Sequence, residues 1–213
     1  MTKTKEKQTL GEEISNSVSH GVGALLSVAG TVVLIVKAAI YGTAIDVVSC
    51  ALYGSSLILL YIFSTLYHSL TNKTAKYVFK VFDHCSIFLL ILGSYIPICL
   101  SFIGGAKGWV LFGINCAAAV LGIVLNSINL FKWKKLSMIL YLVMGWSILM
   151  TIGDIIFNVS LGGILLLAGG GLMYTVGILF YKAKHIKYMH FIWHLFVLAG
   201  SILQFFFMLN YCF

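Results

Sequence analysis

Residues 45–70 are I-D-V-V-S-C-A-L-Y-G-S-S-L-I-L-L-Y-I-F-S-T-L-Y-H-S-L. This stretch has one acid near its start, one histidine near its end, and otherwise uncharged, mostly apolar residues. A helix needs about 20 such residues to cross the hydrocarbon core of a bilayer, so the stretch predicts a transmembrane helix. Six similar stretches accompany it, separated by Lys-rich or Gly-rich breaks, and together the seven lie at about residues 18–41, 45–70, 81–103, 109–131, 136–157, 161–181 and 190–212.

The composition excludes a soluble or disordered chain. Of the 213 residues, 61% are hydrophobic and 9% are charged, against about a quarter charged in soluble domains. The mean hydropathy is +1.03. Seven spans with short loops use the whole length, at about 30 residues each. We therefore predict an all-α membrane protein of the cell membrane: a seven-transmembrane helical bundle over residues 18–213, preceded by a short N-terminal tail over residues 1–17.

The lysines predict an orientation. The chain has a net charge of +8. Because cytoplasmic loops collect lysine and arginine, the side with more lysines is expected to face the cytoplasm. This places the N-terminus in the cytoplasm and the C-terminus outside. Twelve lysines lie on the predicted inner side and two, Lys37 and Lys107, on the other; the twelve are Lys3, Lys5, Lys7, Lys73, Lys76, Lys80, Lys132, Lys134, Lys135, Lys182, Lys184 and Lys187.

The basic balance does not indicate a nucleic-acid partner. The lysines are scattered between apolar stretches, without arginine or a continuous basic face, which suits lipid headgroups better. The five cysteines are odd in number and lack a C-x-x-C spacing, so they indicate buried thiols rather than a disulfide framework or a zinc knuckle.

Three histidines predict a metal site. His190 and His194 are four residues apart at the start of the last stretch, so both imidazoles project from one face of a helix. His68 ends the second stretch at the same membrane depth and can supply a third nitrogen. Three histidines with an open fourth position are the usual plan of a catalytic zinc site. We predict Zn²⁺ bound by His68, His190 and His194.

Two polar residues at the same depth are candidates for catalysis. Asp83 could deprotonate a water at the metal, and Ser64, one turn before His68, could donate a hydrogen bond to that water or to an oxyanion. Each has a simpler alternative. Asp83 could form a salt bridge with Lys80, and Ser64 could bond its own helix backbone.

Other polar residues near the predicted inner face have less specific interpretations. His20, His84 and His185 are each more typical of residues that anchor a helix at the membrane interface than of ligands. Glu12, Glu13 and Asn16 could cap the first helix or contact the site, and capping is the simpler explanation. Asp46 and Asp154 lie on the opposite side, and we predict no catalytic role for them.

Four segments of the chain resemble the bacterial hemolysin III branch of the family that includes the progestin and adipoQ receptors. The alkaline ceramidases are similar more distantly. Together the segments are specific, and they fall in order in the first three predicted helices and the last. They are E-I-S-N-S-V-S-H-G-V-G-A-L-L-S from Glu13, S-T-L-Y-H from Ser64, F-D-H-C-S-I-F-L-L-I-L-G-S-Y-I-P from Phe82, and H-F-I-W-H-L-F-V-L-A-G-S from His190.

The resemblance implies zinc at His68, His190 and His194, with Asp83 and Ser64 around the water of the metal, and a cytoplasmic N-terminus. The chain departs from bacterial relatives at Phe191, where an acid is common, and at Gln204, where a further histidine is common. Neither change removes a ligand. The long N-terminal extension of the animal receptors is absent, so no hormone-receptor function is carried over.

Two functions remain open. The first is a zinc-dependent hydrolase of a lipid amide or ester, in which a membrane lipid or fatty acid enters the bundle. The second is a non-enzymatic regulator or sensor of membrane homeostasis that zinc stabilises. A secreted cytolysin is disfavoured because seven apolar spans need a membrane throughout, and a transporter because the ionisable residues gather at one face. The sequence gives no indication of a protein partner or of an oligomeric state.

Overall fold

Helices make up every regular element in the described part of the chain, residues 8–183 and 185–212 of the computed structural model. A π-helical segment follows Pro97, and a 3₁₀ segment separates α4 from α5. The elements in order are α1 (Leu10–Tyr41), α2 (Ala44–Ser69), α3 (Lys73–Pro97), η1 (Ile98–Ile103), α4 (Gly105–Trp146), η2 (Ser147–Thr151), α5 (Ile152–Asn158), α6 (Leu161–Lys182) and α7 (Met189–Tyr211).

Polar caps, rather than the ends of the apolar stretches, set where several helices begin. Thr9 and Glu12 form a reciprocal capping box at the start of α1, so the helix begins eight residues before the apolar stretch at residue 18. The Asn72 side chain accepts hydrogen bonds from two backbone amides in the first turn of α3, which likewise begins eight residues before its apolar stretch.

Six helices are long and apolar enough to cross a membrane. One of them, Gly105–Asn158, has 54 residues. At 1.5 Å per residue it would be about 80 Å long, far more than the about 30 Å of a hydrocarbon core. Its backbone leaves helical geometry at Asn129 (φ −160°, ψ 92°). Side-chain contacts then join its two halves in antiparallel pairs: Ser137 with Asn126, Ser147 with Asn115, and Lys107 with Asp154. The chain therefore doubles back at Asn129.

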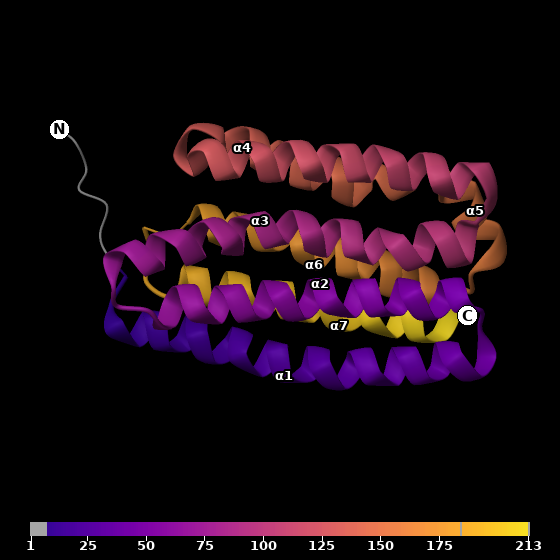
Figure 1. Cartoon of the computed structure of the whole chain (residues 1–213), viewed down its shortest axis with the longest axis horizontal. Coiled ribbons are helices and arrows are strands. Elements are labelled where there is room, and N and C mark those ends of the chain that lie inside the picture. Colours follow the sequence, from indigo (N-terminus) through magenta and orange to yellow (C-terminus); the bar gives the residue numbers. More distant parts are fainter. Residues whose placement is uncertain (1–7, 184, 213) are drawn as a thin grey trace.

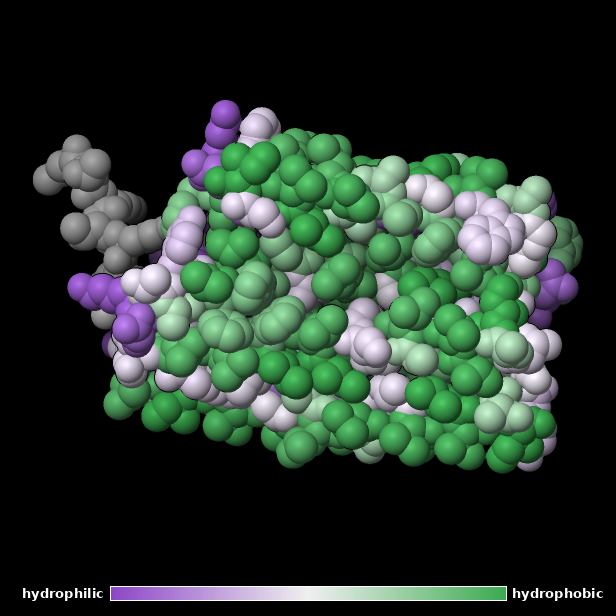
Figure 2. Space-filling model, viewed as in Figure 1, coloured by the Kyte–Doolittle hydropathy of each residue, from purple (hydrophilic) through white to green (hydrophobic). Residues whose placement is uncertain are grey.

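The helices run side by side along the long axis of the molecule (Figure 1). α1 packs against α2 and α7, α2 against α3, and α6 against α7. The large buried side chains at their centre include Tyr53, Tyr61 and Phe207. The face in Figure 2 is apolar along the middle of the bundle, with its hydrophilic residues gathered towards the two ends. An apolar flank between polar ends is the surface expected of a protein embedded in lipid.

The two ends of the bundle differ. The N-terminal end, as we call it, is where α1 begins, α2 ends, α3 begins, α6 ends and α7 begins; the C-terminal end is the opposite one (Figure 1). Lys37 and Lys107 belong to the C-terminal end. The tail lysines Lys3, Lys5 and Lys7 and the loop residue Lys184 lie outside the described residues. The remaining lysines lie at or next to the N-terminal end: Lys73, Lys76, Lys80, Lys132, Lys134, Lys135, Lys182 and Lys187.

Candidate metal centre

The structure brings His68, His190 and His194 together at the N-terminal end. His68 lies in the last turn of α2, and the other two lie in the first two turns of α7. One nitrogen from each ring can be chosen so that all three atoms lie within 4.8 Å of one another. His68 and His194 are buried, at 3% and 2% exposure. These three imidazoles could hold a metal ion.

A carboxylate from α1 fixes the ring of His68. Glu13 Oε2 lies 2.7 Å from His68 Nδ1, and its second oxygen lies 2.7 Å from the ammonium of Lys76. His68 Nε2 is buried and has no hydrogen-bond partner among the described residues. An ionised carboxylate can only accept, so Nδ1 carries the proton and Nε2 presents its lone pair to the site.

The backbone of α1 holds His194 in a similar way. His194 Nδ1 lies 3.1 Å from the carbonyl oxygen of Asn16 and 3.3 Å from Ser19 Oγ. The carbonyl accepts the Nδ1 proton, which leaves Nε2 as the ligand atom. Histidines that bind metals almost always donate their other ring proton to a carboxylate or a backbone carbonyl. His68 and His194 both have this arrangement.

The structure separates the alternatives for the acids at the start of α1. Glu12 caps, because its carboxylate accepts hydrogen bonds from the backbone amides of Thr9 and of Tyr188. Glu13 and Asn16 contact the histidines instead. Capping was thus the wrong choice for Glu13 and Asn16, because both contact histidines on other helices.

The three donors suit a small ion that prefers nitrogen ligands. A tetrahedral zinc with bonds of about 2.0–2.1 Å places its ligand nitrogens roughly 3.4 Å apart, which is compatible with three nitrogens that all lie within 4.8 Å of one another. Three imidazoles without a cysteine, and with an apolar space beside them, match an open rather than a closed site. The residues present therefore fit the implied metal.

Ser64 and Asp83 line the same cavity as His190 and His194. Ser64 is fully buried, and its Oγ has no hydrogen-bond partner among the described residues. The Asp83 carboxylate lies 3.6 Å from Nδ1 of the neighbouring His84. Both predicted catalytic residues thus belong to the wall of the cavity that His190 and His194 line.

The interface interpretation of His20 is wrong. His20 is 3% exposed, lines the same cavity, and stacks on His194 with ring centroids 3.6 Å apart. The spacing of Glu13, Asn16 and His20, at i, i+3 and i+7, places all three on one face of α1 and could have indicated this. His84 is bonded to the Lys80 carbonyl and to the Tyr181 hydroxyl, and His185 is exposed.

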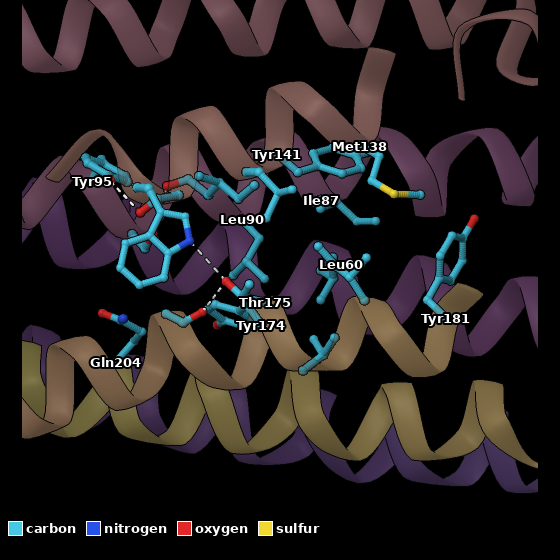
Figure 3. A pocket seen from close by; sticks show the side chains of 18 of the residues that line it. Leu60, Ile87, Leu90, Tyr95, Met138, Tyr141, Tyr174, Thr175, Tyr181 and Gln204 are labelled. Atoms are coloured by element: carbon cyan, nitrogen blue, oxygen red, sulfur yellow. Dashed lines mark hydrogen bonds between the residues drawn. The ribbon is translucent and has the colours of Figure 1, made fainter. Parts of the chain in front are cut away.

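An apolar cavity of about 210 Å³ extends from the histidines into the bundle. It is lined from His190 to Gln204 along α7, which at 1.5 Å per residue is about 21 Å. One leaflet, half of a core of about 30 Å, is shorter than this. Figure 3 shows Tyr181 at one end of the cavity and Gln204 and Tyr95 at the other. The space is thus a long cavity with a mostly apolar lining.

Comparisons with known proteins identify a family. The family model described as "Haemolysin-III related" matches residues 8–205. The chain belongs to the haemolysin-III related family. This match includes the three histidines, Ser64 and Asp83, as well as the α1 residues that contact them.

Two named bacterial relatives match nearly the whole chain, and a human one matches a shorter part of it. Hemolysin-3 of Bacillus cereus is 40% identical over 98% of this chain and 95% of its own length. The Hemolysin-3 homolog of Bacillus subtilis is 43% identical over 96% of each. The human monocyte to macrophage differentiation factor is 30% identical over 70% of this chain and 64% of its own length. No solved structure matches the chain significantly.

The family and the helices together define the location. Six helices of the described chain are apolar enough to span a membrane, and the haemolysin-III related relatives match it along almost its full length. The protein is a multi-pass protein of the cell membrane.

Proposed function

We propose that this protein is a zinc-dependent hydrolase that cleaves an amide or ester bond of a membrane lipid. The observation that carries the proposal is the long apolar cavity that has His190, His194, Asp83 and Ser64 in its wall, with His68 next to the two histidines. A purely structural metal site needs neither the cavity nor the two polar residues.

Each residue has a separate task in this reaction. Zinc, when bound by His68, His190 and His194, would serve as a Lewis acid that polarises a carbonyl and lowers the pKa of water. Asp83 takes the proton from the attacking water and delivers it to the leaving amine or alkoxide. Ser64 donates its hydroxyl proton as a hydrogen bond to the developing oxyanion. The apolar wall holds the acyl chain and excludes bulk water.

We also infer the finer topology from the doubling back at Asn129. Counted as two spans, the 54-residue helix raises the six apolar helices to seven, and an odd number agrees with termini at opposite ends of the bundle (Figure 1). The lysines at the N-terminal end of the bundle favour the cytoplasmic side of the membrane for that end. Residues 1–17 are then the cytoplasmic tail, of which residues 10–17 are already helical, and residues 18–213 the membrane domain.

A second candidate is a regulator of membrane homeostasis without turnover. The contacts of Glu13 favour it, because this carboxylate joins α1 to His68 on α2 and to Lys76 on α3. A metal at the histidines would extend that connection to α7. The bundle would then respond to metal or lipid by loosening or tightening at its N-terminal end.

Lipid turnover by the purified protein separates the two candidates. Zinc-loaded protein is incubated with ceramides and phospholipids of defined chain length, and released fatty acids are measured by mass spectrometry. The hydrolase releases fatty acid. Asp83→Asn keeps its zinc but loses about 10²-fold or more in rate, the usual contribution of a general base.

The control is Asp154→Asn, which changes an acid at the other end of the bundle and should hydrolyse at the wild-type rate. Zinc without any released fatty acid in the wild type would contradict the hydrolase and favour the regulator. An unchanged rate in Asp83→Asn would contradict the assigned base.

A further inference from the structure

His20 is a buried polar side chain with no assigned task. Both ring nitrogens lack a hydrogen-bond partner among the described residues. A backbone group of His194 lies close to the ring, but no hydrogen bond of normal geometry forms. An unpaired polar group in an apolar interior is destabilising, so we expect a group from outside the chain to form a hydrogen bond with it.

The packing around His20 holds its ring in one orientation. One face stacks on His194 at an interplanar angle of 11°, and the edge-on ring of Tyr61 packs against it at 5.0 Å. Gly23, one turn further along α1, makes room for Tyr61, because a Cβ at that position would lie 2.7 Å from Tyr61 Cδ1. The ring is therefore positioned precisely although its nitrogens are unpaired.

The stacking also shows that His20 is not a fourth ligand of the same metal. An imidazole binds an ion with a lone pair that lies in the plane of its ring. The rings of His20 and His194 are nearly parallel and 3.6 Å apart, so an ion in the plane of His194 is displaced from the plane of His20. That displacement exceeds a zinc–nitrogen bond of about 2.0–2.1 Å. His20 therefore lies beside the three histidines, as part of the cavity wall but outside the ligand set.

We propose that His20 binds the polar head of the lipid, donating a ring N–H hydrogen bond to a carboxylate or carbonyl oxygen of a long acyl chain. Most of the cavity wall beyond the N-terminal end is apolar, with uncharged polar side chains such as Thr175 and Gln204, whereas its ionisable histidines and Asp83 lie at the N-terminal end, so a ligand with one charged head and a long tail places its head here. His20 thus selects fatty acids and acyl amides or esters over hydrocarbons without a head. This inference rests on the proposed lipid substrate and names the residue that recognises it.

The test measures binding and metal content together. Purified zinc-loaded protein is titrated with cis-parinaric acid, a fluorescent long-chain fatty acid, and zinc is measured by elemental analysis. His20→Phe keeps the stacked ring and removes both nitrogens. We expect it to bind the acid about tenfold more weakly or worse, because hydrogen bonds to charged groups are strong, with zinc unchanged. His20→Gln restores a donor and should bind within about threefold of the wild type.

Two results would overturn the inference. The first is wild-type affinity for the acid in His20→Phe, and the second is loss of zinc from it, which would make His20 a support of the metal. If the phenylalanine variant does not fold, His20→Met removes the donor with a more adaptable side chain. Weaker binding in a protein that hydrolyses no lipid would support the role of His20 and contradict the hydrolase, so the two proposals fail separately.

Discussion

The two ends of the bundle use the same residue types for different purposes. At the C-terminal end, Asp46 closes a capping box with Thr43 at the start of its own helix, and Asp154 pairs with the exposed Lys107. At the N-terminal end, Glu13 and the backbone of Asn16 reach from α1 to imidazoles on α2 and α7. Acids that interact within a helix or at the surface support the fold, whereas those that connect helices build a site.

The largest effect on zinc binding is expected at the N-terminal end, when one of the three histidines that would bind the metal is removed. His194→Ala deletes one of three nitrogens, and two imidazoles in a flexible arrangement bind zinc far more weakly. The zinc content should fall from one ion per chain to below about a tenth, and hydrolysis should disappear with it, as measured by elemental analysis and fatty-acid release.

The matched control is His185→Ala, which removes an exposed histidine at the same end. It should keep both zinc and activity. Retention of stoichiometric zinc by His194→Ala would show that the three histidines are not the ligands.

An intermediate effect on zinc affinity is expected from Glu13, and its neighbour Glu12 provides the comparison. Glu13→Gln keeps an acceptor for His68 Nδ1 but removes its charge, and the loss of such a supporting carboxylate typically weakens metal binding by about 10–100-fold. Competition with a zinc chelator measures the affinity. Glu12→Gln is the control, because glutamine is accepted in a capping box and Glu12 does not contact the histidines. Equal zinc affinities in Glu13→Gln and Glu12→Gln would show that Glu13 supports the metal site no more than the capping residue does.

The smallest effect is expected at the C-terminal end. Lys107 is 73% exposed and Asp154 32%, and pairs of this kind contribute about 1 kcal/mol or less. Lys107→Ala should shift the melting temperature of the solubilised protein by only about 2–4 °C at most and leave zinc binding unchanged. A loss of zinc in this variant would mean that the two ends are coupled.

The sequence predicts the parts of the site that depend on spacing along one helix. His190 and His194 are four residues apart and so share one helix face. His68 ends the second apolar stretch, which places it at the same membrane depth. The order of the helices therefore predicts that the three side chains lie close together. His20 was missed because no second histidine lies three or four residues from it along the helix. Its signal was the shared face with Glu13 and Asn16.

The sequence alone does not decide between adjacent residues of the same type. Glu12 and Glu13 are adjacent acids in the same turn, and only the packing of α1 against α2 and α7 decides which one caps and which one reaches His68. The reversal near residues 132–135 was predicted from three lysines, yet the backbone turns at Asn129. Apolar composition predicts that a break exists, and local side-chain contacts decide its position.

X-ray absorption at the zinc edge tests the central claim most directly. Purified zinc-loaded protein should show three imidazole nitrogens and one oxygen ligand at about 2.0–2.1 Å, the coordination of an open three-histidine site. His68→Ala should lose this signal. A six-oxygen or sulfur-containing shell, or a wild-type spectrum that persists in His68→Ala, would contradict the assignment of His68, His190 and His194 as the metal centre.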